Sequence, residues 1–470
     1  MGVVVAESKA AATLVIYLGR RRACPRIVRD DRLLGNNSLM LQPSDPAAPT
    51  ATKPSGYGKP LVVAILGNVI EYYDATLYGL LAVFLSRAFF AFSDANTALL
   101  ATYATFIIAY AVRPIAGVLL GHLADIKGHR FVLMLTINLM TIGTVGIGLL
   151  PTYATIGIWA PVLLIILRTV QGVGASAEYT VATSYAIEQG PSQKSQYLTG
   201  WSNAGANMGP MLASLIAMLL ASTFGDEFLS TGGWRIPFLL SAPFGLLVFY
   251  LRRQMVADGM AHSPSPEVRR EARAPLIVAL RGHWGTVASV IAMGAGQRVG
   301  TFCIQAYFVT ALIRLGYGGT MSMLISIVLF GIGVPTSVYG GVLADRFGGR
   351  KMLVLFFGLY TLATMPLFYV MGLSLPLTML GLLVCAVLNN LVAAPLSASY
   401  IMSFPRAVRG AASALNYNVG SALIGATAPL TATWLVGRTG SEHAFGWYMA
   451  GMCLISCLAA AFFFPHPRTD

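Results

Sequence analysis

Six ionisable side chains stand inside long apolar stretches of this sequence: Glu71, Asp74, Arg113, Arg168, Glu178 and Arg298. A charge at the centre of a bilayer costs at least about 2.5–3.5 kcal/mol on insertion scales, so such residues usually face a water-filled cavity or each other. Glu71 and Asp74 are three residues apart, which puts both on one side of a helix. Because neighbouring carboxylates repel in a low dielectric, one of them is expected to bind and release a proton near neutral pH.

These charges predict a proton-coupling group made of Glu71, Asp74, Arg168 and Glu178. Asp74 is the leading candidate for the proton site; alternatively, it is permanently paired with an arginine and shapes a helix interface. A guanidinium at Arg168 that faces the Asp74 helix would keep the carboxylate ionised until the two separate, unless the pair is static. Glu178 follows Arg168 by ten residues, about 15 Å along a helix, so it is either a second proton relay or a structural partner.

Arg298 is the strong charge in the apolar interior of the second half, and Gly294 and Gly296 beside it permit close approach or a local break. A guanidinium in a wet cavity binds a planar carboxylate through two parallel hydrogen bonds. We therefore predict that Arg298 anchors a substrate carboxylate. Further polar lining is predicted from Gln297, Tyr73, Gln305 and Asn389, with Tyr307 and Asn390 as weaker candidates.

The elements that must hold these residues are transmembrane helices. Of the 470 residues, 56% are hydrophobic and only 10% charged, against about 25% charged in a soluble chain. A spanning helix needs about 20 apolar residues. Twelve such stretches follow one another, at about 61–84, 97–120, 131–150, 155–181, 197–221, 235–251, 284–311, 319–343, 351–372, 375–400, 410–436 and 444–465. We predict an all-α membrane protein with two bundles of six transmembrane helices.

Composition divides the chain into four parts. Residues 1–58 hold an arginine triplet and a Pro/Ala/Thr-rich stretch, which predicts a disordered cytoplasmic extension in which Met40 is an alternative start. The first bundle is expected at 59–251 and the second at 284–466. Between them, 252–283 is rich in Arg, Pro and Ala and is predicted to be a central cytoplasmic loop.

Positive charge predicts the orientation. The net charge is +13. With both termini cytoplasmic, the inner segments hold 24 Lys and Arg residues and the outer segments four, as the positive-inside rule expects. The basic balance is thus a signal of membrane orientation, and we predict no nucleic-acid partner. The five cysteines are scattered and have no metal-ligand spacing, so neither a metal site nor a cofactor is predicted.

The pattern G-x-L-A-D-x-x-G-x-R occurs twice, 220 residues apart, after the second and eighth apolar stretches. A looser pair, from Lys194 and from Arg409, opens the fifth and eleventh stretches, so the halves are duplicated. An acidic residue in an inner loop opposes the topology rule and needs another reason, so we predict gates; the alternative is that these residues only set topology. The gating candidates are Arg113, Gly121, Asp125, Gly128, Arg130, Gly341, Asp345, Gly348 and Arg350.

The repeated pattern resembles the loop signature of the major facilitator superfamily. More narrowly, the chain resembles its metabolite:H+ symporters, which include α-ketoglutarate, citrate, shikimate and proline/betaine permeases. The matching segments are Gly67-Asn68…Glu71-Tyr-Tyr-Asp74, Arg113-Pro114-Ile-Ala-Gly117, Arg168-Thr-Val-Gln171-Gly172…Glu178, Trp234-Arg235-Ile-Pro237-Phe238 and Asn416-Tyr417-Asn418…Pro429. The resemblance implies two bundles around a central cavity and links Arg168 to proton coupling. Ile126 and Ser176-Ala177 depart from the family pattern.

The stretch Tyr153–Pro161 resembles the α-ketoglutarate permeases in particular. We therefore expect proton-coupled symport of a small organic acid by alternating access, in a monomer embedded in the lipid bilayer of the inner membrane. The alternatives are symport of a compatible solute such as proline or betaine, proton-coupled drug efflux, and a transporter-like sensor. The sequence has no phosphate-binding loop, G-x-S-x-G elbow or H-E-x-x-H helix, so an enzyme is not expected.

Overall fold

The computed structural model describes residues 58–91, 94–257, 283–308, 311–312, 315–317, 319–371, 373–405 and 409–464. The predicted N-terminal extension up to Tyr57, with Met40, and residues 258–282 of the predicted central loop lie outside the described residues.

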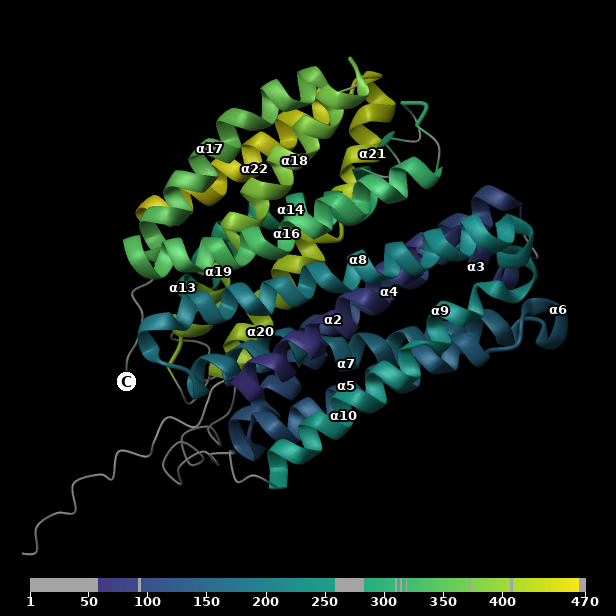
Figure 1. Cartoon of the computed structure of the whole chain (residues 1–470), viewed down its shortest axis with the longest axis horizontal. Helices are drawn as coiled ribbons and strands as arrows, with labels where there is room; N and C mark the ends of the chain where they lie inside the picture. Colours follow the sequence, from purple (N-terminus) through teal and green to yellow (C-terminus); the bar gives the residue numbers. More distant parts are fainter. Residues whose placement is uncertain are drawn as a thin grey trace, which may run out of the picture. The chain divides into compact units, whose positions relative to one another are not determined.

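Helices make up all the regular structure in these ranges (Figure 1). The first half contains α2 (Gly58–Leu80), α3 (Ala82–Phe89), α4 (Ala95–Lys127), α5 (His129–Leu149), α6 (Tyr153–Ile156), α7 (Trp159–Gln189), η1 (Ser192–Lys194), α8 (Ser195–Phe228), η2 (Leu229–Gly233), α9 (Arg235–Leu239) and α10 (Ser241–Ala257). The second half contains α13 (Trp284–Met293), α14 (Ala295–Phe302), η3 (Cys303–Tyr307), α16 (Gly319–Phe347), α17 (Gly349–Val370), α18 (Leu375–Leu391), α19 (Ala393–Met402), α20 (Arg409–Gly420), η5 (Ser421–Gly425), α21 (Ala428–Thr439) and α22 (His443–Phe462).

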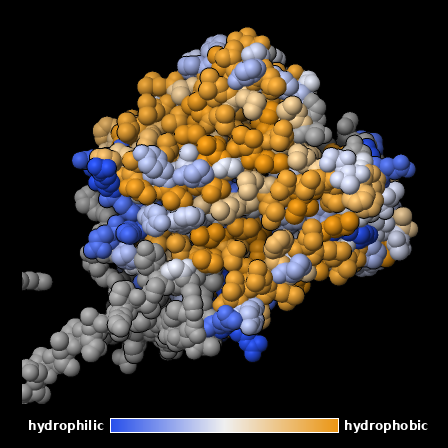
Figure 2. Space-filling model, in the orientation of Figure 1, coloured by the Kyte–Doolittle hydropathy of each residue, from blue (hydrophilic) through white to orange (hydrophobic). Residues whose placement is uncertain are grey.

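Ten helical stretches of the described residues are long and apolar enough to cross a membrane. Two bent pairs, α2 with α3 and α13 with α14, turn by 67° and 46° at their breaks and bring the number to twelve when each pair is one span. The predicted all-helical membrane fold is thereby confirmed. Apolar side chains cover most of the face seen in Figure 2, while hydrophilic residues gather near the ends of the helices. Such a surface suits contact with lipid tails.

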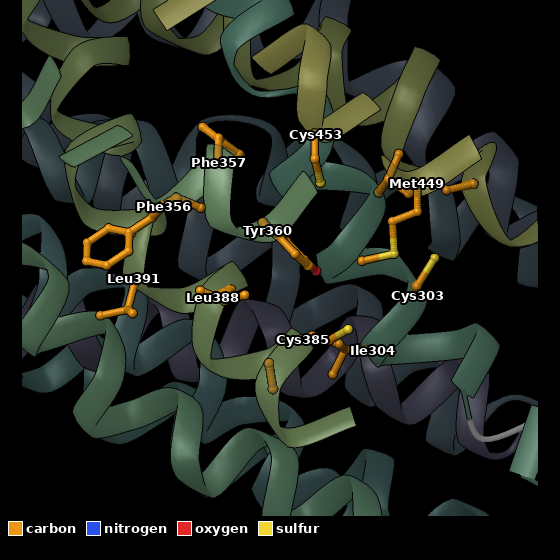
Figure 3. Packing of buried hydrophobic residues seen from close by; sticks show 14 of the residues in the cluster. Cys303, Ile304, Phe356, Phe357, Tyr360, Cys385, Leu388, Leu391, Met449 and Cys453 are labelled. Atoms are coloured by element: carbon orange, nitrogen blue, oxygen red, sulfur yellow. The ribbon is translucent and has the colours of Figure 1, made fainter. Parts of the chain in front are cut away.

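Each half has its own buried core. In the second half, Cys303, Cys385 and Cys453 are buried around Tyr360 and Met449 (Figure 3). These thiols lie among apolar side chains, where free cysteine behaves as a small hydrophobic residue. The halves meet mainly along two helix pairs, α8 with α16 and α4 with α20.

The repeated pattern is mostly helical, which corrects its prediction as a loop. Its first seven residues complete α4 and, in the second copy, α16, while Gly128 and Gly348 form the turns with φ of 94° and 95°. A residue with a side chain is strained in that left-handed region, so glycine is required there. The observed helices end later than the predicted spans, because the backbone continues its helical hydrogen bonds beyond the apolar stretch from which each span was predicted.

Candidate functional site

A cavity of about 40 Å³ lies between the two halves. This is room for roughly three waters. Its walls come from α2, α4, α7 and α8 on one side and from helices between α14 and η5 on the other. Among its lining residues are the predicted Glu71, Arg113, Gln297, Arg298 and Gln305.

Arg298 lies in α14, just after the break at Gly294, and its side chain is buried. Its terminal nitrogens donate long hydrogen bonds to the carbonyl oxygens of Ile291 (3.4 Å) and Asn416 (3.3 Å), and its Nε has no partner within the part of the chain that the structure describes. No carboxylate of the described residues forms an ion pair with it. A buried guanidinium in this state favours an incoming anion.

Glycines make the space that the Arg298 guanidinium occupies. A Cβ on Gly294 or on Gly420 would collide with its side chain, and the Tyr400 ring lies 5.0 Å from its central carbon. The break between α13 and α14 at Gly294 and the glycine that ends α20, Gly420, therefore form one cradle for a single side chain.

Glu71 and Arg113 form an ion pair with an Nη1–Oε1 distance of 3.2 Å, and both side chains are buried. The guanidinium of Arg113 also lies 4.1 Å above the Tyr110 ring, and Oε2 of Glu71 has no hydrogen-bond partner among the described residues. The sequence predicted Arg113 as a gate near the end of its helix. Because α4 continues to Lys127, Arg113 instead lies in its middle, in the cavity wall.

A second, smaller cavity of about 10 Å³ lies inside the first half and is lined by Glu71, Asp74, Arg113 and Arg168. Glu71 and Arg113 line both cavities and thus stand between them. The structure therefore brings three of the four predicted proton-coupling residues into one place.

Asp74 and Arg168 are connected by two side chains for which the sequence predicted no role, Thr144 and Gln171, although Gln171 belongs to one of the segments that carry the family resemblance. Thr144 donates to Oδ2 of Asp74 (2.5 Å), Gln171 Nε2 donates to the Thr144 hydroxyl (2.5 Å), and Arg168 Nη1 donates to Gln171 Oε1 (2.9 Å). Arg168 also lies 3.9 Å above the Tyr78 ring. Hydroxyl and amide groups in apolar helices carry no charge signal, so only the tertiary structure finds them.

Tyrosines from both halves line the main cavity. The hydroxyls of Tyr72 and Tyr417 are hydrogen-bonded across the halves, and the Tyr179 and Tyr417 rings stack with centroids 4.8 Å apart. The ring centroids of Tyr400 and Tyr417 are 6.3 Å apart. The sequence predicted Tyr73 instead of Tyr72. Tyr73 points away from the cavity and donates to the carbonyl of Pro237 at 2.7 Å, because neighbouring residues on a helix face different sides.

The predicted Asn389 and the weaker candidates Asn390 and Tyr307 are not among the residues that line the cavity. Asn389 donates to Thr301, which lines the cavity, at 2.9 Å. Asn390 accepts from Asn207 of the other half at 2.8 Å, and Tyr307 donates to Glu442.

Glu178 lies apart from the other predicted proton-coupling residues, in an ion pair with Arg252 of α10. Both oxygens of Glu178 accept from Arg252, and Thr136 donates to one of them at 2.5 Å. A Cβ on Gly67 would collide with both partners. The sequence analysis assigned Arg252 to the central loop because the apolar stretch ends at Leu251, but Arg252 is buried within the bundle.

We expect Arg252→Ala to destabilise the protein by about 3–5 kcal/mol, because it leaves a buried carboxylate without its partner. The thermal unfolding of detergent-purified protein measures this effect. The double variant Glu178→Gln/Arg252→Met removes both charges and should recover most of the stability. If the recovered double variant has lost proton-driven uptake, Glu178 acts in coupling; normal uptake would make the pair structural.

The two copies of the repeated pattern pack against the other half. Asp345 accepts from the backbone N–H groups of Gln196 (3.1 Å) and Tyr197 (2.8 Å), which caps the first turn of α8. A Cβ on Gly341 would lie 3.0 Å from the Cα of Tyr197. In the first copy, a Cβ on Gly121 would lie 2.6 Å from the carbonyl oxygen of Gly410 in α20. The side chain of Asp125 lies outside the described residues. The halves are thus closed at this end, which we call the motif end.

The arginines of the pattern differ from each other in their contacts. Arg350 donates to the carbonyl of Ala461 in α22, a contact within the second half. Nε and Nη2 of Arg130 are buried without a hydrogen-bond partner among the described residues.

Comparison with known proteins identifies the family. Residues 64–429 match the model of the Major Facilitator Superfamily. The chain belongs to this superfamily. The Proline/betaine transporter of Salmonella typhimurium is 31% identical over 80% of this chain and 77% of its own length. The Glycine betaine/proline/ectoine/pipecolic acid transporter OusA of Dickeya dadantii is 30% identical over 86% of this chain and 82% of its own.

Solved structures agree on the superfamily fold. The proton:xylose symporter XylE bound to 6-bromo-6-deoxy-D-glucose has a TM-score of 0.71 at 19% identity, over 87% of this chain and 96% of that one. A partially occluded inward-open XylE has a TM-score of 0.67 at 17% identity, over 87% and 98% of the two chains. This major facilitator protein is therefore a secondary transporter rather than an enzyme, and a multi-pass protein of the inner membrane.

Proposed function

We propose that this transporter is a proton-coupled symporter of small zwitterions of the proline and betaine class. The sequence motifs favoured an organic acid, with a compatible solute as an alternative. The named substrates of the relatives favour the alternative, since both are transporters of proline and betaine.

The observation that carries the proposal is the pairing of charges around the cavity. Arg298 is a cation without an ion-pair partner among the described residues, and Glu71 has one oxygen without a hydrogen-bond partner. A zwitterion supplies one group for each: its carboxylate binds Arg298, and its ammonium group lies near Glu71. The faces of Tyr72, Tyr179 and Tyr417 add cation–π attraction, which does not require an N–H donor.

A dicarboxylate fits these charges less well. It needs two cations, and the second cation of the cavity, Arg113, is already paired with Glu71 at 3.2 Å. Protonation of Glu71 would release Arg113 for a second carboxylate. That route keeps the organic acid as the second candidate, and the uptake experiment separates the two.

Proton coupling is assigned to the smaller cavity. Asp74 is the proton site, Arg168 stabilises its ionised form, and Glu71 joins that site to the substrate cavity. In this mechanism the proton and the zwitterion are both bound before the halves rock and expose the site to the other side. The protein acts as a monomer, and the motif end, with its excess of Lys and Arg, faces the cytoplasm.

We assign gating to the motif end. The residues are Gly121 and Asp125 of the first copy of the pattern and Gly341 and Asp345 of the second. We expect Gly121→Val to reduce net uptake by about tenfold, since overpacking costs typically 1–3 kcal/mol. The atoms closest to the new side chain belong to the backbone of Gly410 and Ala411, which cannot rotate away as a side chain can. Amide hydrogen exchange in the first turn of α20 should become faster. Gly79→Val is the matched control, because a Cβ on Gly79 of α2 meets nothing within 4 Å. Equal effects of the two variants would contradict the gate.

The proposed function is tested by uptake into proteoliposomes. Radiolabelled proline, glycine betaine, α-ketoglutarate, citrate and shikimate are each offered under an inward proton gradient, with and without a protonophore. We expect proline or betaine to accumulate and the protonophore to abolish accumulation. Accumulation of α-ketoglutarate or citrate instead would establish the second candidate. Uptake that does not depend on the proton gradient would exclude proton symport.

A further inference from the structure

We propose that Thr144 and Gln171 are positioning residues which link the Asp74 carboxylate to Arg168, and that the Thr144 hydroxyl changes its acceptor when Asp74 binds a proton. This inference rests on the proposed proton coupling. The two residues come from α5 and α7, and neither touches the main cavity.

Gln171 has one orientation in this chain. Its Oε1 accepts from Arg168 at 2.9 Å, so its Nε2 faces Thr144 and donates to the hydroxyl at 2.5 Å. The reversed amide would bring a donor against the arginine, which has no acceptor. Gly143 gives the side chain its room, because a Cβ there would lie 2.5 Å from Cγ of Gln171. Arg168 thereby fixes the direction of the hydrogen bond that reaches Thr144.

Thr144 has two acceptors within reach of one hydrogen. Its Oγ1 lies 2.5 Å from Oδ2 of Asp74 and 3.0 Å from the carbonyl oxygen of Met140. A hydroxyl donates once and accepts twice. Because Gln171 always occupies one acceptor position, the hydroxyl hydrogen must go either to Asp74 or to Met140.

Each choice matches one protonation state of Asp74. When Asp74 is ionised, Thr144 donates to it. When a hydronium ion reaches the smaller cavity, one of its O–H bonds breaks to leave a water and an O–H bond forms on Oδ2; that O–H then donates to Thr144, and the Thr144 hydrogen turns to Met140. No other atom moves and no donor or acceptor of the three groups is lost, so the site holds both states at little cost.

The charged groups around Asp74 are few. Glu71 lies on α2, the same helix as Asp74. Arg113 lines the smaller cavity from α4, and Arg168 lines it from α7. The phenol of Tyr78 lies under Arg168, and α5 contributes the uncharged Thr144. Arg168 and Arg113 favour the ionised state, whereas Glu71 opposes it. Thr144 and Gln171 add a directional contact that charge alone does not provide.

Thr144→Val removes the hydroxyl and keeps the shape of the side chain. A hydrogen bond to a charged group corresponds to about a tenfold or larger change in equilibrium. We expect the proton concentration for half-maximal uptake to fall about tenfold, because both states of Asp74 lose a hydrogen bond to Thr144 and the bond to the ionised carboxylate is the stronger of the two. Release of the proton then becomes slow, and gradient-driven uptake should fall about tenfold. Counterflow, in which labelled and unlabelled substrate exchange at constant proton occupancy, should remain within about twofold of the wild-type rate.

Thr144→Ser keeps the hydroxyl and should restore the wild-type pH profile, which a role in packing alone would not require. Gln171→Met should reproduce the Thr144→Val profile and serves as the test if the valine variant does not fold. A folded valine or methionine variant with the wild-type pH profile would overturn the proposal, as would a serine variant as defective as valine. Wild-type uptake without proton dependence would instead overturn the proposed function, and this inference with it.

Discussion

Replacing Arg298 by alanine should raise the substrate concentration for half-maximal uptake by about 100-fold or more. The variant loses two charge-assisted hydrogen bonds to the substrate carboxylate, each worth about 1.5–3 kcal/mol. No other unpaired arginine of the described residues lines the main cavity, because Arg113 is held by Glu71 at 3.2 Å. Binding of radiolabelled substrate to purified protein measures the loss directly and separates it from any change in turnover.

Arg298→Lys is the matched variant, because it keeps the charge and removes the planar fork. It should bind more tightly than alanine and more weakly than the wild type. Gly420→Ala offers an independent test, since its Cβ would occupy space now filled by the guanidinium; it should weaken binding without removing the charge. An alanine variant of Arg298 with unchanged apparent affinity would rule out the anchor and the orientation proposed for the zwitterion.

Most of the fold was predictable from the sequence. Twelve apolar stretches predict twelve spans because lipid leaves the backbone no other hydrogen-bonding partner than its own helix. The ends of the helices were less predictable. Residues Gly121–Lys127 continue α4 although His122, Asp125 and Lys127 interrupt their apolar character, because packing of Gly121 against the other half supports them. The breaks at Leu81 and Gly294 lie inside apolar stretches and left no signal in hydropathy.

The sequence predicted which charged residues belong to the candidate site, but not which of them form ion pairs with each other. Helix periodicity put Glu71 and Asp74 together, yet the partner of each charge depends on which helices become neighbours. Glu178 pairs with Arg252, which lies 74 positions away and beyond the end of a predicted span. The tyrosines escaped notice because aromatic residues are common in membrane helices. The position of Tyr72 next to Glu71 could have indicated its role. The prediction chose the following residue, Tyr73, which faces the other side of the helix.

Replacing Asp74 by asparagine should abolish accumulation of substrate against its gradient while leaving exchange intact. A symporter can concentrate its substrate only if each cycle also moves a proton. With an imposed difference of one pH unit and one proton per substrate, the wild type can reach an accumulation ratio of about ten, since a tenfold gradient stores about 1.4 kcal/mol. The asparagine variant carries no proton on that side chain, so its ratio should remain about one.

Counterflow distinguishes this loss of coupling from a loss of folding or binding. Asparagine keeps the size of the side chain, and its amide N–H can donate to the Thr144 hydroxyl as the protonated carboxyl does, so the contact seen at 2.5 Å is retained. The variant therefore resembles a protein locked in the neutral state, and it should exchange labelled for unlabelled substrate at nearly the wild-type rate. Glu71→Gln is the informative comparison, because Glu71 lines both cavities and its loss should weaken substrate binding as well. If Asp74→Asn still accumulates substrate uphill, Asp74 is not the proton site, and Glu71 becomes the carboxylate that couples the two cavities.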